Sequence, residues 1–308
     1  MKRIVIMIMT ALLFIGTGRA WATIESGFLY AGGSFTSINY PGASSTWAAY
    51  GINDSGDIVG QYGDNSGEHG FLFAGGSFSS INYPGASGIT ETHSINGSGD
   101  IVGVYQDNSG PHGFLDAGGS LSPINYPGAS GTNAYGINGS GDIVGWWENP
   151  GLYGFLYAGG SFTPINPAGA SDIIAYGING SGDIVGSYLD NSAFQGFLYA
   201  GGSFTSINYP GASLTEAHGI NDSGDIVGDY WDNSGEHGFL FSGGSFYPIN
   251  YPGASATYAY GINGSGDIVG GYQEVEAAVP EPSSVLLLGC GLIGLLLTSR
   301  LFTSRQKD

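Results

Sequence analysis

The stretch "INGSGDIVG" at residues 95–103 decides how the sequence is interpreted, because it recurs along the chain. It returns letter for letter at 137–145, 178–186 and 262–270, and as "INDSGDIVG" at 52–60 and 220–228. Successive copies begin 41 to 43 residues apart. A fixed period of this size is typical of solenoids, propellers and other arrays of small units.

Each repeat contains four short runs of high β-propensity, which in the second copy read "GFLF", "SFSSINY", "THSIN" and "DIVGVY". Glycine-rich turn sequences separate them, and the segments between the chain ends show no helical period. Within the nonapeptide, Ile-Asn ends one strand and Asp-Ile-Val-Gly begins the next, so we expect one hairpin per repeat. Four strands in about 42 residues match one propeller blade.

The phase of the repeat predicts how the ends of the domain meet. The first strands, at 28–40, are the second half of a repeat, and the last, at 258–272, are the first half. We therefore expect an all-β fold, a six-bladed β-propeller over 28–273 that closes by pairing its N-terminal and C-terminal strands. The alternative is an open β-solenoid with two coils per repeat, which would need caps.

Residues 1–22 have the pattern of a secretory signal peptide. Lys2 and Arg3 precede an apolar run at 4–15, and Ala20-Trp21-Ala22 forms a cleavage signature. The run is too short for a spanning helix, which disfavours the alternative of an N-terminal anchor. The six-repeat domain is thus expected to occupy residues 23–278.

Residues 279–308 form a second distinct end. Pro280, Glu281 and Pro282 precede an apolar run that, with Arg300 snorkelling, predicts a single membrane helix at 285–302. Basic residues within 300–307 follow, and the positive-inside rule keeps this tail cytoplasmic. The alternative to a processed signal is a permanent single-pass anchor.

The order Pro-Glu-Pro, short apolar helix and basic cluster resembles the PEP-CTERM sorting signal. The resemblance implies recognition of Pro280, Glu281, Pro282 and Arg300 by an exosortase, a membrane protease-transpeptidase. It also implies transient anchoring in the inner membrane of a Gram-negative bacterium, followed by delivery to the cell envelope, cell surface or extracellular matrix. Such species make exopolysaccharide, so a role in biofilm is expected.

The repeats also resemble the HAF repeat of extracellular repeat proteins. The matching residues are His69-Gly70-Phe71 and its counterparts, and Gly51-Ile52-Asn53 followed by Gly56-Asp57-Ile58-Val59-Gly60. The chain departs from that family in having Gly for Ala, and in lacking the His in three copies. The resemblance implies an extracellular location and a repeat architecture.

Charge excludes one class of partner. All 6 Lys and Arg lie in the two end segments, while 24 of the 25 acidic residues lie within 23–282, since only Asp308 is outside. Nucleic acid is excluded as a partner because phosphate binding needs basic side chains. Anionic polysaccharide should be repelled unless a divalent cation bridges. The single cysteine, Cys290, cannot form an intramolecular disulfide.

Repetition itself favours a non-enzymatic protein. Nearly every polar position recurs in register, and no nucleophile or metalloprotease motif is found. We expect a structural or glycan-contacting protein, because the Tyr of each "NYPG" and the tryptophans suit neutral glycans. The alternative use of these aromatic side chains is packing between blades. The alternative is a carbohydrate-active or metal-dependent enzyme that uses the propeller channel.

Two sets of residues are candidate sites. The acidic turns present Asn53, Asp54 and Asp57, and the counterparts Asp100, Asp142, Asp183, Asp225 and Asp267, as ligands for Ca²⁺, the one cofactor considered; the alternative is that they only form turns. The residue before each Gly-Ile-Asn or Ser-Ile-Asn is Tyr in four copies and His93 or His218 in two, and only those two have a glutamate two residues earlier. Glu91, His93, Glu216 and His218 are therefore a candidate channel site for a metal or a proton, against chance variation at a tyrosine position.

Overall fold

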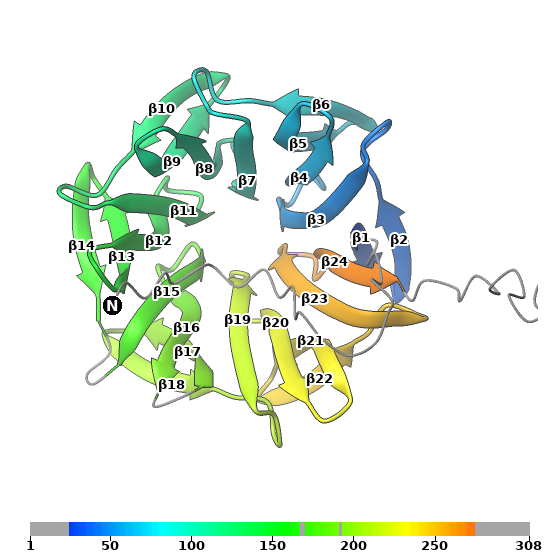
Figure 1. Cartoon of the computed structure of the whole chain (residues 1–308). Coiled ribbons are helices and arrows are strands. Elements are labelled where there is room, and N and C mark those ends of the chain that lie inside the picture. Colours follow the sequence, from blue (N-terminus) through cyan, green and yellow to red (C-terminus); the bar gives the residue numbers. More distant parts are fainter. Residues whose placement is uncertain (1–24, 167–169, 191–192, 275–308) are drawn as a thin grey trace, which may run out of the picture. The chain divides into compact units, whose positions relative to one another are not determined.

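The computed structural model describes residues 25–166, 170–190 and 193–274, and every regular element in these ranges is a β-strand. Residues 23–275 form one compact unit. Its 24 strands surround a common centre as a ring of four-stranded units (Figure 1). The expected all-β, propeller-like fold is confirmed. The predicted signal peptide at 1–22 and the predicted sorting segment and helix at 279–308 lie outside the described residues.

The strands fall into six units of four, numbered here by chain order. Unit 1 contains β3 (Ser45–Ile52), β4 (Ile58–Asp64), β5 (Gly67–Ala74) and β6 (Ser77–Ile81), and unit 2 contains β7 (Ile89–Ile95), β8 (Ile101–Asp107), β9 (Gly110–Ala117) and β10 (Ser120–Ile124). Unit 3 contains β11 (Gly131–Ile137), β12 (Ile143–Glu148), β13 (Leu152–Ala158) and β14 (Ser161–Ile165), and unit 4 contains β15 (Ser171–Ile178), β16 (Ile184–Asp190), β17 (Ala193–Ala200) and β18 (Ser203–Ile207). Unit 5 contains β19 (Leu214–Ile220), β20 (Ile226–Asp232), β21 (Gly235–Ser242) and β22 (Ser245–Ile249), and unit 6 contains β23 (Ala254–Ile262), β24 (Ile268–Glu274), β1 (Glu25–Ala31) and β2 (Ser34–Ile38).

Strand pairing within each unit is antiparallel, and unit 6 combines the two ends of the domain. β24 pairs with β1, with Leu29 opposite Val269. Backbone pairing groups the strands into four sheets, two of eight strands and two of four. Each eight-stranded sheet is two units joined through one parallel residue pair, Glu68 with Ile89 or Glu236 with Ala256.

The repeated nonapeptide forms the turn between the first two strands of each unit. In unit 3, Asn138 Oδ1 accepts hydrogen bonds from the backbone N–H of Ser140 at 3.0 Å and of Asp142 at 2.9 Å. Gly141 has a φ of 82°, a conformation that favours glycine. The Asn138 side chain donates to Asp142 Oδ2 at 3.2 Å. One buried asparagine therefore satisfies two backbone donors of its own turn.

The same asparagine also links each unit to the next. Its Nδ2 donates to the backbone oxygen of the equivalent asparagine in the following unit, at N···O distances of 3.1 to 3.3 Å: Asn53 to Asn96, Asn96 to Asn138, Asn138 to Asn179, Asn179 to Asn221, Asn221 to Asn263, and Asn263 to Asn53. The last of these bonds spans 210 residues of sequence and returns to the first unit. An open solenoid, the alternative interpretation, has no such return.

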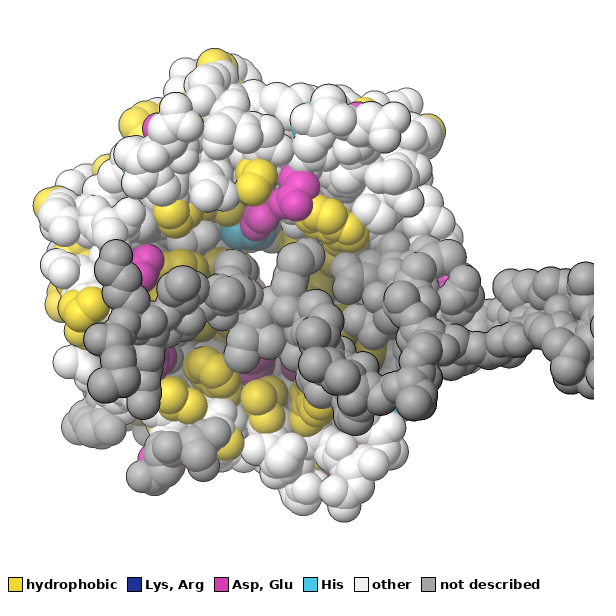
Figure 2. All heavy atoms as spheres, in the orientation of Figure 1, with side chains coloured by type: hydrophobic (Ala, Val, Ile, Leu, Met, Phe, Trp, Pro, Cys, Tyr) yellow, Lys and Arg dark blue, Asp and Glu magenta, His cyan; other side chains and the backbone are white. Residues whose placement is uncertain are grey.

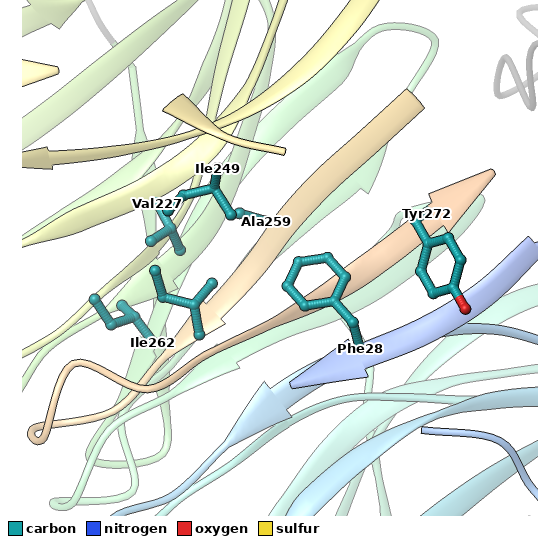
Figure 3. Close-up of a cluster of buried hydrophobic side chains, with 7 residues drawn as sticks. Phe28, Val227, Ile249, Ala259, Ile262 and Tyr272 are labelled. Carbon is teal, nitrogen blue, oxygen red and sulfur yellow. The ribbon is translucent and has the colours of Figure 1, made fainter. Parts of the chain in front are cut away.

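The hydrophobic core lies between neighbouring units. Figure 3 shows Val227 and Ile249 of unit 5 packed against Ala259 and Ile262 of unit 6. In every "DIVG" run, Ile and Val are almost fully buried and point to opposite faces of the strand. Each second strand is thus buried on both faces, which explains its uninterrupted apolar sequence. None of the described elements is a helix with the length and hydropathy needed to cross a membrane.

Candidate functional site

The innermost strand of every unit carries one ring side chain that faces its neighbours around the centre. These residues are Tyr50, His93, Tyr135, Tyr176, His218 and Tyr260, called the channel ring below. Each contacts the next with ring centroids 4.3 to 5.6 Å apart, and Tyr260 contacts Tyr50. Figure 2 shows an opening at the middle of this face, with apolar, acidic and histidine side chains around it.

A β-bulge places each residue of the channel ring. The register between the first two strands of a unit skips one residue, as between Ala134 and Gly136 or between Ala217 and Gly219. The skipped residue is the one before Gly-Ile-Asn or Ser-Ile-Asn in all six units. A bulge redirects the side chain of the extra residue, which here brings the six rings into mutual contact.

Unit 2 brings the predicted pair Glu91 and His93 together. His93 Nε2 lies 3.2 Å from Glu91 Oε2, and the ring stacks on Tyr135 with centroids 4.3 Å apart. Nδ1 donates to the backbone oxygen of Ala134 at 2.9 Å, which holds the ring orientation. The residue opposite Glu91 on β8 is Val104, so β8 adds no ionisable side chain to this pair.

Unit 5 extends the other predicted pair to a cluster of three. Glu216 on β19 lies directly opposite Asp229 on β20, and His218 Nε2 lies 2.6 Å from Asp229 Oδ1. Ligand atoms of Glu216, His218 and Asp229 all lie within 4.8 Å of one another. Among the described residues, this is the one group of three or more such side chains close enough to hold a metal ion.

The cluster is poor in solvent and rich in negative charge. The side chains of His218 and Asp229 are 10% and 3% exposed. Burial, and next the charge of Asp229, raise the pKa of Glu216. For His218, burial lowers the pKa, but the charge and hydrogen bond of Asp229 outweigh it and the pKa is raised. Glu216 Oε1 accepts hydrogen bonds from Ser187 at 3.0 Å and from Tyr176 at 3.3 Å.

Glu236 on β21 adds a third carboxyl group to this region. Burial, and then the nearby charge of Asp229, raise its pKa to about 7. A carboxyl whose pKa is higher in the folded state than its ordinary 4.5 destabilises the fold progressively as the pH rises between those two values. Below pH 4.5 the penalty is absent, and above pH 7 it is complete.

We therefore expect Glu236→Gln to stabilise the protein at pH 8 and to have little effect at pH 4.5. A shift of this size corresponds to a gain on the order of 3 kcal/mol at pH 8. Denaturant unfolding at both pH values, in EDTA, measures the change. Glu274→Gln, at an exposed carboxyl, is the control. A gain at pH 8 no larger than that of the control would contradict the burial argument.

Sequence reasoning missed Asp229. The position after "DIVG" is Gln61, Val104, Trp146, Ser187, Asp229 and Gly271 in the six copies, so it varies inside an otherwise repeated motif. That variation was the available signal, because a frame shared by all copies leaves individual function to the positions that differ. The contact itself follows from the register of β19 with β20, which the sequence does not state.

The predicted acidic turns lie at the turn between the first two strands of each unit. Asp57 Oδ2 accepts from Asn53 Nδ2 at 3.1 Å, and Asp54 Oδ1 accepts from the backbone N–H of Gly264 in unit 6 at 2.7 Å. The counterparts Asp100, Asp142, Asp183, Asp225 and Asp267 accept from their own asparagine in the same way. These hydrogen bonds give the acidic side chains a structural role, within their own turn or between units. Binding of Ca²⁺ at these turns stays a prediction.

Exposed turns between the second and third strands of units 1, 2 and 5 combine Asp, Ser, His and Asn. In unit 1, Ser66 Oγ donates to Asp64 Oδ1 at 2.6 Å and lies 2.9 Å from His69 Nε2. These Ser66 hydrogen bonds come first, and the His69 contact adds to them, in lowering the pKa of Asp64 to about 2. Since the hydroxyl proton is given to a carboxylate and not to the imidazole, the group is arranged as a turn and not as an activated nucleophile.

Comparison with known proteins confirms the sorting signal and the fold class. Residues 278–300 match the family model of the PEP-CTERM protein-sorting motif. This signal marks an exported protein that an exosortase sorts to the cell envelope or surface. A search of curated protein sequences finds no match to the chain.

Similar solved structures share the architecture at low identity. A TolB-like protein from Agrobacterium tumefaciens has a TM-score of 0.60 at 11% identity, covering 83% of this chain and 100% of that one. TolB from Acinetobacter baumannii has a TM-score of 0.57 at 11% identity, covering 73% and 64%. A nidogen/laminin complex gives 0.50 at 11% identity, covering 78% and 97%. These likenesses show a propeller-like fold and nothing about activity.

Proposed function

We propose that this chain is an exported, non-enzymatic repeat protein that serves as a structural or glycan-contacting component of the cell envelope or exopolysaccharide matrix. The observation that carries the proposal is the use of the repeated polar side chains. In all six units the asparagine of the nonapeptide bonds to its own turn and to the next unit. A catalytic site needs different polar residues in different units, whereas here the same asparagine makes the same structural hydrogen bonds in every unit.

Charge and aromatic surface support the choice of a neutral glycan as partner. The segment 23–282 has no Lys or Arg, so anionic polymers are repelled. Half-buried rings from the "NYPG" turns stack on the second strand, as Tyr40 does on Tyr62 at 3.7 Å and Tyr126 on Trp147 at 4.2 Å. One face of each ring is occupied by this packing, and the edges and outer faces are what a sugar would contact.

The tail completes the proposal. Anchoring in the inner membrane through 285–302 precedes processing near Pro280, Glu281 and Pro282, in a Gram-negative host whose matrix receives the domain. The resemblance of the repeats to the HAF repeat supports the same extracellular destination. Ca²⁺ at the acidic turns is the one cofactor that the proposal retains.

Cell fractionation of the full-length chain tests this function. In an exosortase-bearing host, we expect the wild-type chain in the envelope or matrix fraction at a reduced mass. Replacing Pro280, Glu281 and Pro282 together by alanine should leave the unprocessed chain in the inner membrane. The same host without its exosortase is the control and should reproduce the variant. Equal distribution of both chains in both hosts would contradict sorting through this tail.

A neutral glycan array with the purified chain separates the remaining roles. Binding without product release supports the glycan-contacting role, and no binding supports a purely structural one. Release of product would instead support the second candidate, a carbohydrate-active or metal-dependent enzyme using the channel. The cluster of Glu216, His218 and Asp229 is the observation that favours this second candidate.

A further inference from the structure

The unit 5 cluster gathers two carboxyl groups at a buried position of the sheet. Glu216 and Asp229 stand directly opposite each other on paired strands, where like charges destabilise a sheet. Asp229 is only 2% exposed, and its Oδ2 atom has no hydrogen-bond partner among the described residues. An unpaired buried carboxylate oxygen is costly. No lysine or arginine exists anywhere in 23–282 to pair with it.

We propose that Glu216, His218 and Asp229 bind one divalent first-row transition-metal ion, with Zn²⁺ as the representative. This site goes beyond the proposed function and does not depend on it. A metal ion would offset both carboxylates, occupy the orphan oxygen of Asp229 and take the place of the proton between Asp229 and His218 Nε2.

The geometry is close to that of a tetrahedral site. Ligand atoms bound at about 2.0–2.1 Å in a tetrahedron lie about 3.3 Å from one another. In unit 5, His218 Nε2 and Asp229 Oδ1 are 2.6 Å apart, and every pair of donor atoms lies within 4.8 Å. Side-chain shifts of about 1 Å would therefore bring all three donors to bonding distance without moving β19 or β20.

The donor set selects the class of metal. Imidazole favours zinc and its first-row neighbours over Ca²⁺ and Mg²⁺, which prefer six or more oxygen ligands. Three protein ligands also leave a coordination position for water or a ligand, as catalytic sites do and closed structural sites do not. Partial exposure of Glu216 and of His218, at 10%, leaves the channel as the route of access.

The repeat supplies matched variants that should fold. His218→Tyr installs the residue that four of the six units have in the channel ring, and Asp229→Ser installs the Ser187 of unit 4. The control is His93→Tyr in unit 2, where Val104 stands in the place of the aspartate and the described residues form no group of three donors. Cys290 is present in every variant, so any binding at that thiol is common to all.

Isothermal titration of ZnCl₂ into the EDTA-stripped, untagged full-length chain in detergent tests the proposal. We expect one ion per chain with a dissociation constant on the order of 1 µM or tighter. His218→Tyr and Asp229→Ser should each weaken binding at least about tenfold, since even indirect supports of a metal site cost that much. His93→Tyr should bind Zn²⁺ as the wild type does. Co²⁺ should give visible absorption bands with the wild type and His93→Tyr, and with neither His218→Tyr nor Asp229→Ser.

Three results would overturn the site. The first is no stoichiometric binding of Zn²⁺ by the wild-type chain. The second is unchanged affinity in His218→Tyr or Asp229→Ser, which would place the ion elsewhere. The third is an equal loss in His93→Tyr, which would assign binding to the channel ring in general. Circular dichroism of each variant confirms that the fold is kept.

Discussion

Asn138→Ala is expected to lower the free energy of unfolding by about 3 kcal/mol, or roughly 10 °C in melting temperature. The change removes the acceptor for the N–H groups of Ser140 and Asp142. It also removes the donor to the backbone oxygen of Asn179 in the next unit, at a site where Asn138 is 4% exposed. Buried backbone groups left without partners are the source of the loss. Denaturant unfolding measures it.

Two further variants separate the roles of the amide. Ser140→Ala, at an exposed position of the same turn, is the control and should change stability by less than about 0.5 kcal/mol. Asn138→Asp keeps an acceptor for the turn but removes the donor to Asn179 and places a carboxylate beside Asp142. It should therefore destabilise as well. If Asn138→Ala cost no more than Ser140→Ala, the asparagine would have no structural role.

Gly145→Ala is expected to cost about 3 kcal/mol or more, or to prevent folding. A Cβ atom at Gly145 would overlap the backbone oxygen of Asn133 and lie 3.0 Å from the Phe155 ring. Because the clash is with backbone, relief requires β11 and β12 to separate, and overpacking of this kind exceeds the usual range for added methyl groups. The final glycine of "DIVG" meets the same obstacle in all six units.

The matched control lies in the same nonapeptide. A Cβ atom added at Gly139 would have no other atom within 4 Å, and the residue does not adopt a positive φ. Gly139→Ala should therefore be neutral or slightly stabilising, since alanine restricts the unfolded chain. Thermal unfolding of the two variants side by side gives the comparison. Equal melting temperatures for Gly145→Ala and Gly139→Ala would contradict the close approach of β11 to Gly145.

Much of the frame could be predicted from the sequence, because periodicity and turn chemistry are local. Four β-prone runs per repeat predicted the four strands of each unit, and the phase of the repeat predicted that β24 pairs with β1. The hydrogen bonds that close the ring could not be predicted, since nothing in a repeat states which neighbour its asparagine contacts. The β-bulge at His218 was likewise unforeseen, and it sets where the side chain points.

The candidate site was predicted in part. Glu91 and Glu216 stood out because they accompany the two histidines, and Glu91 does contact His93. Asp229 was missed because it belongs to another strand, and only the register brings it opposite Glu216. Burial then makes that one carboxylate decisive, since its Oδ2 atom has no hydrogen-bond partner among the described residues and such an atom is costly in a dry site. Near-identical repeats thus hold their individual chemistry in the few positions that differ.

The six units form a closed ring, and Asn263 offers the most direct test of this closure. Asn263 belongs to the last complete nonapeptide, and its Nδ2 donates to Asn53 of the first unit. We predict that Asn263→Ala lowers the free energy of unfolding as much as Asn138→Ala does, within about 0.5 kcal/mol. In an open array the last unit would have no following neighbour and would fray independently. A clearly smaller loss for Asn263→Ala, measured by denaturant unfolding, would contradict the closed ring.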